Sequence, residues 1–510
     1  MRRLLILLAA CALLILRPDI VLGQEARVLR IVAPVEIGGL DLARAGVVFA
    51  RMGIVERLVA ADAAGRPVPA LAERWSVDPS GLVWRFALRV GLHFHDGTRV
   101  TSQAVADSLR RALSDATALA RAPVAAVEPA EDEIVLHLHR PFAALPAFLA
   151  NYGSGILAPS AYDAAGRVHQ VVGTGPFRIT ALTLPMRLEV ERFEGWWGAR
   201  PAIERAIYLV AGQGEMRALM AESGQADLVF ALQPVTVARL KRNPKLEVRL
   251  VSIPRTRMLK LNLASPLFDD VRERRALSLA IDRQGIATAI LRNASLAATQ
   301  LLPPATAEWH LPGLPPPGRD LPRARALLAE AGWRPGPDGI LRDGVGRVFR
   351  TQLSTYSTWP ELPPIAVALQ AQLREIGMEV EIAVGNASDI PRMHRDGTLQ
   401  LGLMSRNYAL VPDPLGAIMT DFAPEGSDWG AMHWSNAELT STITRMDGTE
   451  TLEERAALRR RVSAILREEL PVIPITWSEL GVAIGRRVAN VTVDPFETSY
   501  RLHEITWAER

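Results

Sequence analysis

Two histidine pairs are the residues whose spacing first suggests chemistry. His93 and His95 lie two positions apart, as do His137 and His139, so each pair places two imidazoles on one face of a predicted strand. Two imidazoles are half of a tetrahedral metal site, but no carboxylate or third histidine follows at ligand spacing. We therefore interpret both pairs as residues of a solvated strand face and predict no metal site.

Paired acids and nucleophile motifs give no catalytic site either. Asp269-Asp270 and Glu468-Glu469 lie at the ends of predicted helices, where capping or solvated charge explains them. The chain has no HExxH, no P-loop and no nucleophile elbow, and Gly173–Pro176 lacks the third glycine and following helix of a dinucleotide site. We predict no catalytic residue and no cofactor; a secreted hydrolase with an unrecognised acid pair is the rival interpretation.

Composition limits the class of protein. The chain has 510 residues, 49% of them hydrophobic and 22% charged, which predicts a folded protein of about two to four domains. With 58 basic and 55 acidic side chains the formal charge is only +3, which argues against binding nucleic acid. The single cysteine is Cys11, so the rest of the chain has neither a disulfide nor a cysteine nucleophile.

The first 23 residues have the pattern of a secretory signal peptide. Arg2 and Arg3 precede an apolar run from Leu4 to Leu16, which is shorter than the about 20 residues that span a bilayer. We predict cleavage after Gly23 and a periplasmic protein. Residues 8–11, Leu-Ala-Ala-Cys, also match a lipobox, so lipid anchoring at Cys11 is the alternative.

Predicted strands and helices alternate along the remaining chain, which indicates an α/β protein with mixed sheets. Thr101 has the position of a helix N-cap, and Asp270 with Glu273 has the spacing of a capping box. Alternation over residues 84–90 predicts one apolar strand face, formed by Trp84, Phe86, Leu88 and Val90.

Several short segments occur together in one order along the chain. They are Leu71–Trp75, Gly81–Phe86, His93–Thr98, Val172–Phe177, Glu194–Gly198, Val271–Asp282, Arg395–Gly397 and Pro412–Pro414. These segments resemble the motifs of the family 5 extracellular solute-binding proteins, which are the peptide, opine and nickel-chelate receptors of ABC importers. The resemblance extends from about residue 28 to about residue 480.

This resemblance implies a two-lobed periplasmic-binding-protein fold of class II type, with mixed sheets, the extra subdomain of the peptide/nickel-binding family and a two-strand hinge. The hinge strands are expected near 253–262 and 472–484. The expected division is signal peptide 1–23, lobe I 24–256 with its extra subdomain at roughly 55–175, lobe II 257–476, and a return to lobe I over 477–510.

The implied function is that of a receptor that captures a small solute between its lobes and delivers it to an ABC permease. The solute would be peptide-like, opine-like or a metal chelate, and the receptor a monomer without nucleic-acid partners. A solute sensor or chaperone without an importer is the remaining alternative.

The resemblance also implies which residues contact the solute. They are Arg406, Asn407, Tyr408, Trp429, Trp434, Phe49, Arg51, Met52 and Tyr152. For Arg406 an equal alternative is a surface charge, and for the two tryptophans it is core packing. In this set Arg406 is expected to pair with a ligand carboxylate, and Tyr408 to supply a stacking face.

Two departures from the family pattern bear on the solute. Dipeptide receptors carry an acidic residue where this chain has Leu410, and a buried ammonium requires such a partner. The nickel receptor's paired arginines are expected near 151–156, where this chain reads Asn-Tyr-Gly-Ser-Gly-Ile. We therefore expect a carboxylate-bearing solute rather than a free-amine dipeptide, held in a way that differs from the nickel receptor.

Overall fold

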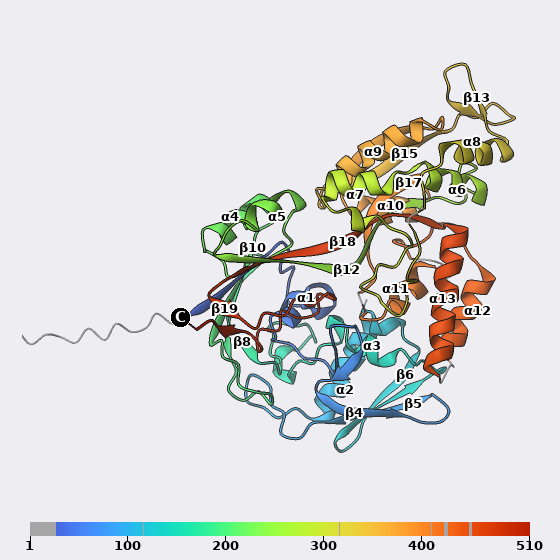
Figure 1. The fold of residues 1–510 in the computed structure, drawn as a ribbon. Helices are drawn as coiled ribbons and strands as arrows, with labels where there is room; N and C mark the ends of the chain where they lie inside the picture. Colours follow the sequence, from blue (N-terminus) through green and yellow to red (C-terminus); the bar gives the residue numbers. More distant parts are fainter. Residues whose placement is uncertain are drawn as a thin grey trace, which may run out of the picture.

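A computed structural model describes residues 27–115, 117–315, 317–409, 411–422, 427–447 and 451–509. The predicted signal peptide, Cys11 and Leu410 lie outside these residues. Figure 1 shows two bodies of chain joined by a pair of long strands. Among the described helices, none is long and apolar enough to cross a membrane.

One ten-stranded mixed sheet runs through both bodies, and its strand order is β16-β15-β17-β12-β18-β11-β1-β10-β9-β8. β1 pairs parallel with β10 and β11, whereas β12 pairs antiparallel with β17 and β18. The mixed α/β architecture expected from the sequence is therefore confirmed. The strands are β1 (Val28–Ala33), β8 (Phe177–Thr183), β9 (Arg187–Arg192), β10 (Arg205–Val210), β11 (Leu228–Phe230), β12 (Leu246–Leu261), β15 (Arg350–Tyr356), β16 (Glu379–Gly385), β17 (Leu401–Asn407) and β18 (Val472–Gly485).

β12 and β18 are the two strands that connect the bodies in Figure 1. They are paired from Leu246 opposite Gly485 to Lys260 opposite Val472. The register shifts between Ile253 and Thr256, and again between Arg257 and Met258. Such irregularities bend a strand and raise its twist, so they locate the bend between the two bodies.

The first body carries a separate antiparallel sheet of order β4-β5-β7-β6, which α2 covers. Thr101 caps α2 as expected, because its side chain accepts a hydrogen bond from the Ala104 N–H. Trp84, Phe86 and Leu88 are buried on β5 as expected, but Val90 lies beyond the strand and is 85% exposed. The elements of this body outside the large sheet are α1 (Leu42–Arg51), β2 (Val59–Ala61), β3 (Pro67–Pro69), β4 (Ala72–Val77), β5 (Val83–Leu88), α2 (Ser102–Ser114), η1 (Leu119–Arg121), β6 (Val124–Pro129), β7 (Glu133–Leu138), α3 (Leu145–Leu149), η2 (Tyr152–Ser154), η3 (Pro159–Ala161), α4 (Gly214–Glu222), α5 (Pro234–Leu240), β19 (Val488–Ala489) and β20 (Thr506–Trp507).

The second body packs helices against β15, β16 and β17. The capping box of Asp270 and Glu273 is present at the start of α6, so this prediction is confirmed. Its elements are α6 (Val271–Ala280), α7 (Arg283–Leu291), η4 (Ala294–Leu296), α8 (Leu321–Glu330), β13 (Arg334–Pro335), β14 (Leu341–Arg342), α9 (Leu362–Arg374), α10 (Asp389–Arg395), α11 (Leu415–Asp421), α12 (Ala437–Asp447) and α13 (Leu452–Glu469).

The buried cores follow the same division. One core takes its residues from Met258 to Ile475 without a member outside that range. Another takes residues from Leu29 to Ile253 and then from Leu480 to Ile505. The chain therefore leaves the first body along β12 and returns to it along β18.

Candidate functional site

A cavity of about 150 Å³ lies where α1 and η2 of the first body meet the end of β17 from the second. Three of the residues expected from the sequence line it, namely Arg51, Tyr152 and Asn407, together with Arg57 and Glu497. We call it the central cavity. A smaller cavity of about 110 Å³ adjoins it and shares Asn151 and Tyr152 with it. Residues from both bodies therefore converge at one place.

Arg51 is the last residue of α1 and is fixed by the C-terminal segment of the chain. Its Nε donates to the backbone oxygen of Glu497 at 2.6 Å, and its Nη2 lies 3.3 Å from the Glu497 carboxylate. Arg255 on β12 donates to the other oxygen of that carboxylate at 2.8 Å. One carboxylate thus neutralises two partly buried arginines.

The loop that presents Glu497 is organised by Asp494. The Asp494 carboxylate accepts hydrogen bonds from the backbone N–H groups of Phe496, Thr498 and Ser499. Glu497 itself has φ 56°, a left-handed conformation that a non-glycine residue adopts only when its surroundings impose it. The loop is therefore built to hold the Glu497 side chain in one place.

The ionisation of Glu497 follows from these contacts. Burial acts to raise the pKa of Glu497, but Arg255 and Arg51 more than offset it, so the pKa lies below its usual value. The carboxylate is consequently charged at neutral pH and is occupied by the two guanidinium groups.

Arg57 lines the central cavity, and part of its guanidinium group is left without hydrogen bonds by the described residues. It is 8% exposed, and its buried Nε and Nη1 atoms have no hydrogen-bond partner among the residues that the structure describes. Burial lowers the pKa of Arg57, although Glu56 and Asp494 act in the opposite direction. Buried polar atoms are normally paired, so unpaired donors beside a cavity indicate an acceptor supplied by a ligand. Sequence reasoning missed this residue.

Tyr152 forms a wall between the two cavities. It begins the short helix η2, which Asn151 caps by accepting from the Gly153 N–H at 2.9 Å. A Cβ on Gly46 of α1 would lie 3.3 Å from the Tyr152 ring, so the ring packs closely on that helix. The ring is thereby positioned at the cavity surface by α1.

Asn407 ends β17 and brings the second body to the cavity. Its side-chain oxygen accepts from the Ala409 N–H at 2.8 Å, and its backbone pairs with Arg255 of β12. The side-chain nitrogen has two further N–H donors, which an anionic or carbonyl group in the cavity can accept.

Arg406 is held inside the second body. Its Nε and Nη2 donate to the two carboxylate oxygens of Asp421 at 2.6 and 2.7 Å, and Asp421 is fully buried. A two-bond fork of this kind uses the donors that a ligand carboxylate would need. The structure therefore gives no support to a contact between Arg406 and a solute, and it shows a buried ion pair rather than a surface charge.

The other expected contact residues pack away from the central cavity. Phe49 and Met52 are fully buried in the core of the first body, and Tyr408 is fully buried beside Met258 in the second. Trp429 and Trp434 are half-buried against the core of the second body. None of these five lines the central cavity.

The middle of the chain matches a known family model. Residues 66–429 match the model described as "Bacterial extracellular solute-binding proteins, family 5 Middle". The chain belongs to this family. Family 5 proteins are solute-binding components of ABC importers and not a family of enzymes, so the receptor class expected from the sequence is confirmed.

Named relatives cover nearly the whole length of this family 5 protein. The nickel-binding periplasmic protein of Escherichia coli (strain K12) is 27% identical over 92% of this chain and 93% of its own. The glutathione-binding protein GsiB of Salmonella typhi is 25% identical over 83% of each chain. The structure of NikA from Brucella suis in complex with Fe(III)-EDTA has a TM-score of 0.84 at 23% identity, covering 94% and 100% of the two chains. The two-lobed fold expected from the sequence is confirmed.

One histidine of each pair in this family 5 protein contacts a neighbouring group of the fold. His95 lies beside the Gly173–Gly175 turn rather than on a solvated face, because its Nε2 lies 2.9 Å from the Gly175 oxygen. Burial lowers the pKa of His95 to about 4, so the ring is neutral at physiological pH. His137 on β7 lies 3.2 Å from the Glu128 carboxylate. In the described part of the chain, no three His, Cys, Asp or Glu side chains are grouped as metal ligands.

Proposed function

We propose that this receptor binds a small solute carrying at least one carboxylate, in the central cavity between the lobes. The observation that carries the proposal is the buried Arg57 guanidinium, whose Nε and Nη1 have no hydrogen-bond partner in the described part of the chain. A ligand carboxylate supplies two acceptor oxygens in the geometry that a guanidinium fork requires. Arg51, Tyr152 and Asn407 complete the surroundings of that group.

The charge of the cavity supports an anionic solute without a free ammonium group. Glu497 is the only acidic side chain among the described residues that line the central cavity, and two arginines already occupy its oxygens. A buried ammonium without a carboxylate partner costs several kcal/mol. Opine-like compounds, amine-blocked peptides and carboxylate chelates fit this requirement, whereas simple dipeptides do not.

A metal ion would reach this site as part of the solute. The described residues offer no cluster of side-chain ligands for a bare cation, and the cavity lining is cationic. An anionic chelate presents carboxylate oxygens to such a lining while its own donors hold the metal. This proposal agrees with the family resemblance to receptors of metal chelates.

We also propose the boundaries and location of the receptor. Lobe I comprises 24–256 and 477–510 and lobe II comprises 257–476, which is supported by the separate cores that end at Ile253 and begin at Met258. Residues 1–23 act as a cleaved signal peptide that places the receptor in the periplasm, where it meets an ABC permease. Intact mass of the exported chain tests the cleavage, and a lipidated Cys11 would contradict it.

Native mass spectrometry of the receptor, purified from the periplasm of its own cell, identifies the solute. Arg57→Gln then tests the site. Loss of one charge-assisted contact, worth about 1.5–3 kcal/mol, weakens binding of the identified solute about 10- to 150-fold. The variant should fold, because it removes a buried charge whose Nε and Nη1 find no hydrogen-bond partner among the described residues. Arg44→Gln on α1, with a side chain 88% exposed, is the matched control and should bind as wild type does.

Equal affinity of wild type and Arg57→Gln for the identified solute would contradict the site. An identified solute without any carboxylate would contradict the solute class. The rival hydrolase interpretation is tested separately: the solute is incubated with receptor, and its mass is followed. A binding protein returns the solute unchanged, whereas consumption of the solute would establish turnover.

A further inference from the structure

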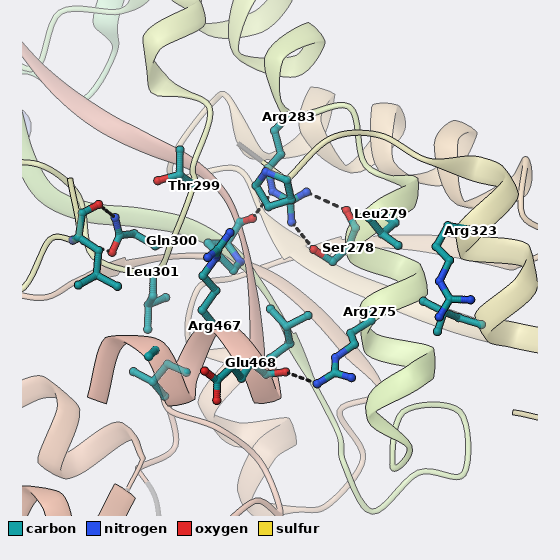
Figure 2. Close-up of a pocket in the computed structure, with 17 residues that line it drawn as sticks. Arg275, Ser278, Leu279, Arg283, Thr299, Gln300, Leu301, Arg323, Arg467 and Glu468 are labelled. Carbon is teal, nitrogen blue, oxygen red and sulfur yellow. Dashed lines mark hydrogen bonds between the residues drawn. The ribbon is translucent and has the colours of Figure 1, made fainter. Parts of the chain in front are cut away.

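A larger cavity, of about 520 Å³, lies in the second body away from the central cavity. It is lined by α6, α8, the end of α13, the start of β18 and residues Thr299–Leu301 (Figure 2). Leu279, Leu327, Leu466 and Leu470 contribute to its apolar walls. It shares no lining residue with the central cavity. Its volume falls in the range of about 300–1,000 Å³ that is typical of small-molecule sites. We call it the α6–α13 cavity.

Among the described residues, four arginines and one acid line the α6–α13 cavity, namely Arg275, Arg283, Arg323, Arg467 and Glu468 (Figure 2). Arg323 pairs with Glu330 at 2.8 Å, and the Glu468 carboxylate lies 3.4 Å from Arg461. Within the described ranges, none of the other three arginines forms an ion pair. The cavity therefore carries uncompensated positive charge.

Arg283 places part of this charge in the interior. It is 2% exposed, and its Nε donates to the Pro474 oxygen at 2.8 Å. Its Nη1 and Nη2 donate to the backbone oxygen and the hydroxyl of Ser278, as Figure 2 shows. Burial lowers the pKa of Arg283 to about 10, so the group remains charged at neutral pH. A buried charge is screened by salt far less than an exposed one, so its field persists in the cavity.

Arg275 and Arg467 bring exposed charge to the same cavity. Arg275 on α6 donates to the backbone oxygen of Glu468 at 3.1 Å, which leaves its guanidinium beside the end of α13 (Figure 2). Arg467 lies in the last turn of α13 and is exposed. These two side chains are exposed, whereas Arg283 is buried and fixed by its hydrogen bonds.

We propose that the α6–α13 cavity is a second ligand site, for a small amphipathic carboxylate with an apolar body, such as a medium-chain acyl anion. The apolar body would lie against the leucine walls, and the carboxylate would be held by Arg275 and Arg467 in the field of Arg283. An amphiphile satisfies both properties of the lining, because apolar burial needs a hydrocarbon and guanidinium groups that form no ion pair with the described residues can accept an anion. A neutral amphiphile would leave the charge uncompensated.

Titration of the full mature chain with decanoate, followed by calorimetry and by melting temperature, tests this proposal. We expect saturable binding of decanoate, and at least tenfold weaker binding of decanol and decylammonium. Arg467→Gln should weaken decanoate binding at least fivefold, and Ala464→Phe, which fills the cavity from α13, should abolish it. Arg460→Gln is the matched control, because Arg460 is exposed on α13 and does not line the cavity.

Arg57→Gln distinguishes binding in the α6–α13 cavity from binding in the central cavity, because this variant should leave decanoate affinity unchanged. Absence of saturable binding would overturn the proposal. So would equal affinity for decanoate and decylammonium, or unchanged decanoate affinity in both Arg467→Gln and Ala464→Phe. Loss of binding in Arg57→Gln alone would place decanoate between the lobes and would equally overturn it.

Discussion

The 2.8 Å ion pair between Arg255 and Glu497 joins the hinge strand β12 to the C-terminal loop. The same carboxylate holds Arg51 at the end of α1, so the central cavity and the hinge share one charged group. A movement of β12 at its register shifts would therefore displace Glu497 and Arg51, which line the central cavity.

Glu497→Gln should destabilise the protein by about 2–3 kcal/mol near neutral pH, because two partly buried arginines lose their counter-charge. The pKa of Glu497 is depressed, so the contribution of its charge is present above the unfolded pKa and is lost as pH falls through the lower folded pKa. Urea unfolding of both proteins should show a difference that shrinks in acid. A difference that is constant with pH would contradict the ionic origin.

Arg406→Ala should lower the melting temperature strongly, because it leaves the fully buried Asp421 carboxylate unpaired. Breaking a buried pair costs about 3–5 kcal/mol. The double variant Arg406→Ala with Asp421→Ala should recover part of that loss. The folded fraction of Arg406→Ala should bind the solute with wild-type affinity. A large loss of affinity in correctly folded protein would show that Arg406 contacts the solute.

Gly173→Ala should destabilise by about 2–4 kcal/mol, because a Cβ there would lie 2.1 Å from the backbone oxygen of Ile54. Gly212→Ala is the control, since a Cβ at Gly212 meets no atom within 4 Å. Thermal unfolding of the two variants should separate them clearly. Equal melting temperatures would show that the Gly173 turn has room that the structure does not show.

Glu273→Gln should flatten the dependence of stability on pH. Burial raises the pKa of Glu273 to about 7, although its bond from the Trp333 indole acts in the opposite direction. A carboxyl group whose pKa is higher in the folded protein contributes its full stabilisation of the folded state at a pH below its pKa in the unfolded chain. This contribution is lost as pH rises through about 7. Glutamine has one acceptor oxygen, which can keep the 2.7 Å bond from the Trp333 indole while the 3.4 Å bond from the Asp270 N–H is lost. Because glutamine carries no charge to desolvate, the variant should gain about 1–2 kcal/mol relative to wild type between acidic and alkaline pH.

Unfolding by urea at acidic and alkaline pH measures this gain. Glu381→Gln is the control, because Glu381 is exposed on β16 and should leave the pH profile of wild type unchanged. An identical pH profile for Glu273→Gln and wild type would show that Glu273 titrates normally.

Local patterns in the sequence predicted local structure well. The caps at Thr101 and Asp270 depend on neighbours two or three residues away, and both form as expected. The face of β5 was predicted as far as Leu88 and was wrong at Val90, where the strand has already ended. Alternation alone does not show where a strand ends.

Long-range contacts decided which parts of the site could be predicted. Arg51 and Glu497 are 446 positions apart, and no local pattern pairs them. The partner of Arg406 is Asp421 on another element, so an arginine that resembled a ligand group is a buried ion pair. For Arg57 a signal was present: Glu56 and Arg57 interrupt the apolar residues Val55 and Leu58, and such a charged pair within a buried segment indicates a functional role.

The path of the chain has a consequence for biosynthesis. The core that contains Leu29 also needs Leu480 and Ile505, whereas the core from Met258 to Ile475 is made of one continuous stretch. Domains fold as units while the chain emerges from its N-terminus. All residues of the core from Met258 to Ile475 are therefore synthesised before the core that contains Leu29 is complete, because that core also needs the segment from Leu480 to Ile505. A chain that stops after Ile475 would keep every residue of the core from Met258 to Ile475 and would lack the C-terminal residues of the core that contains Leu29.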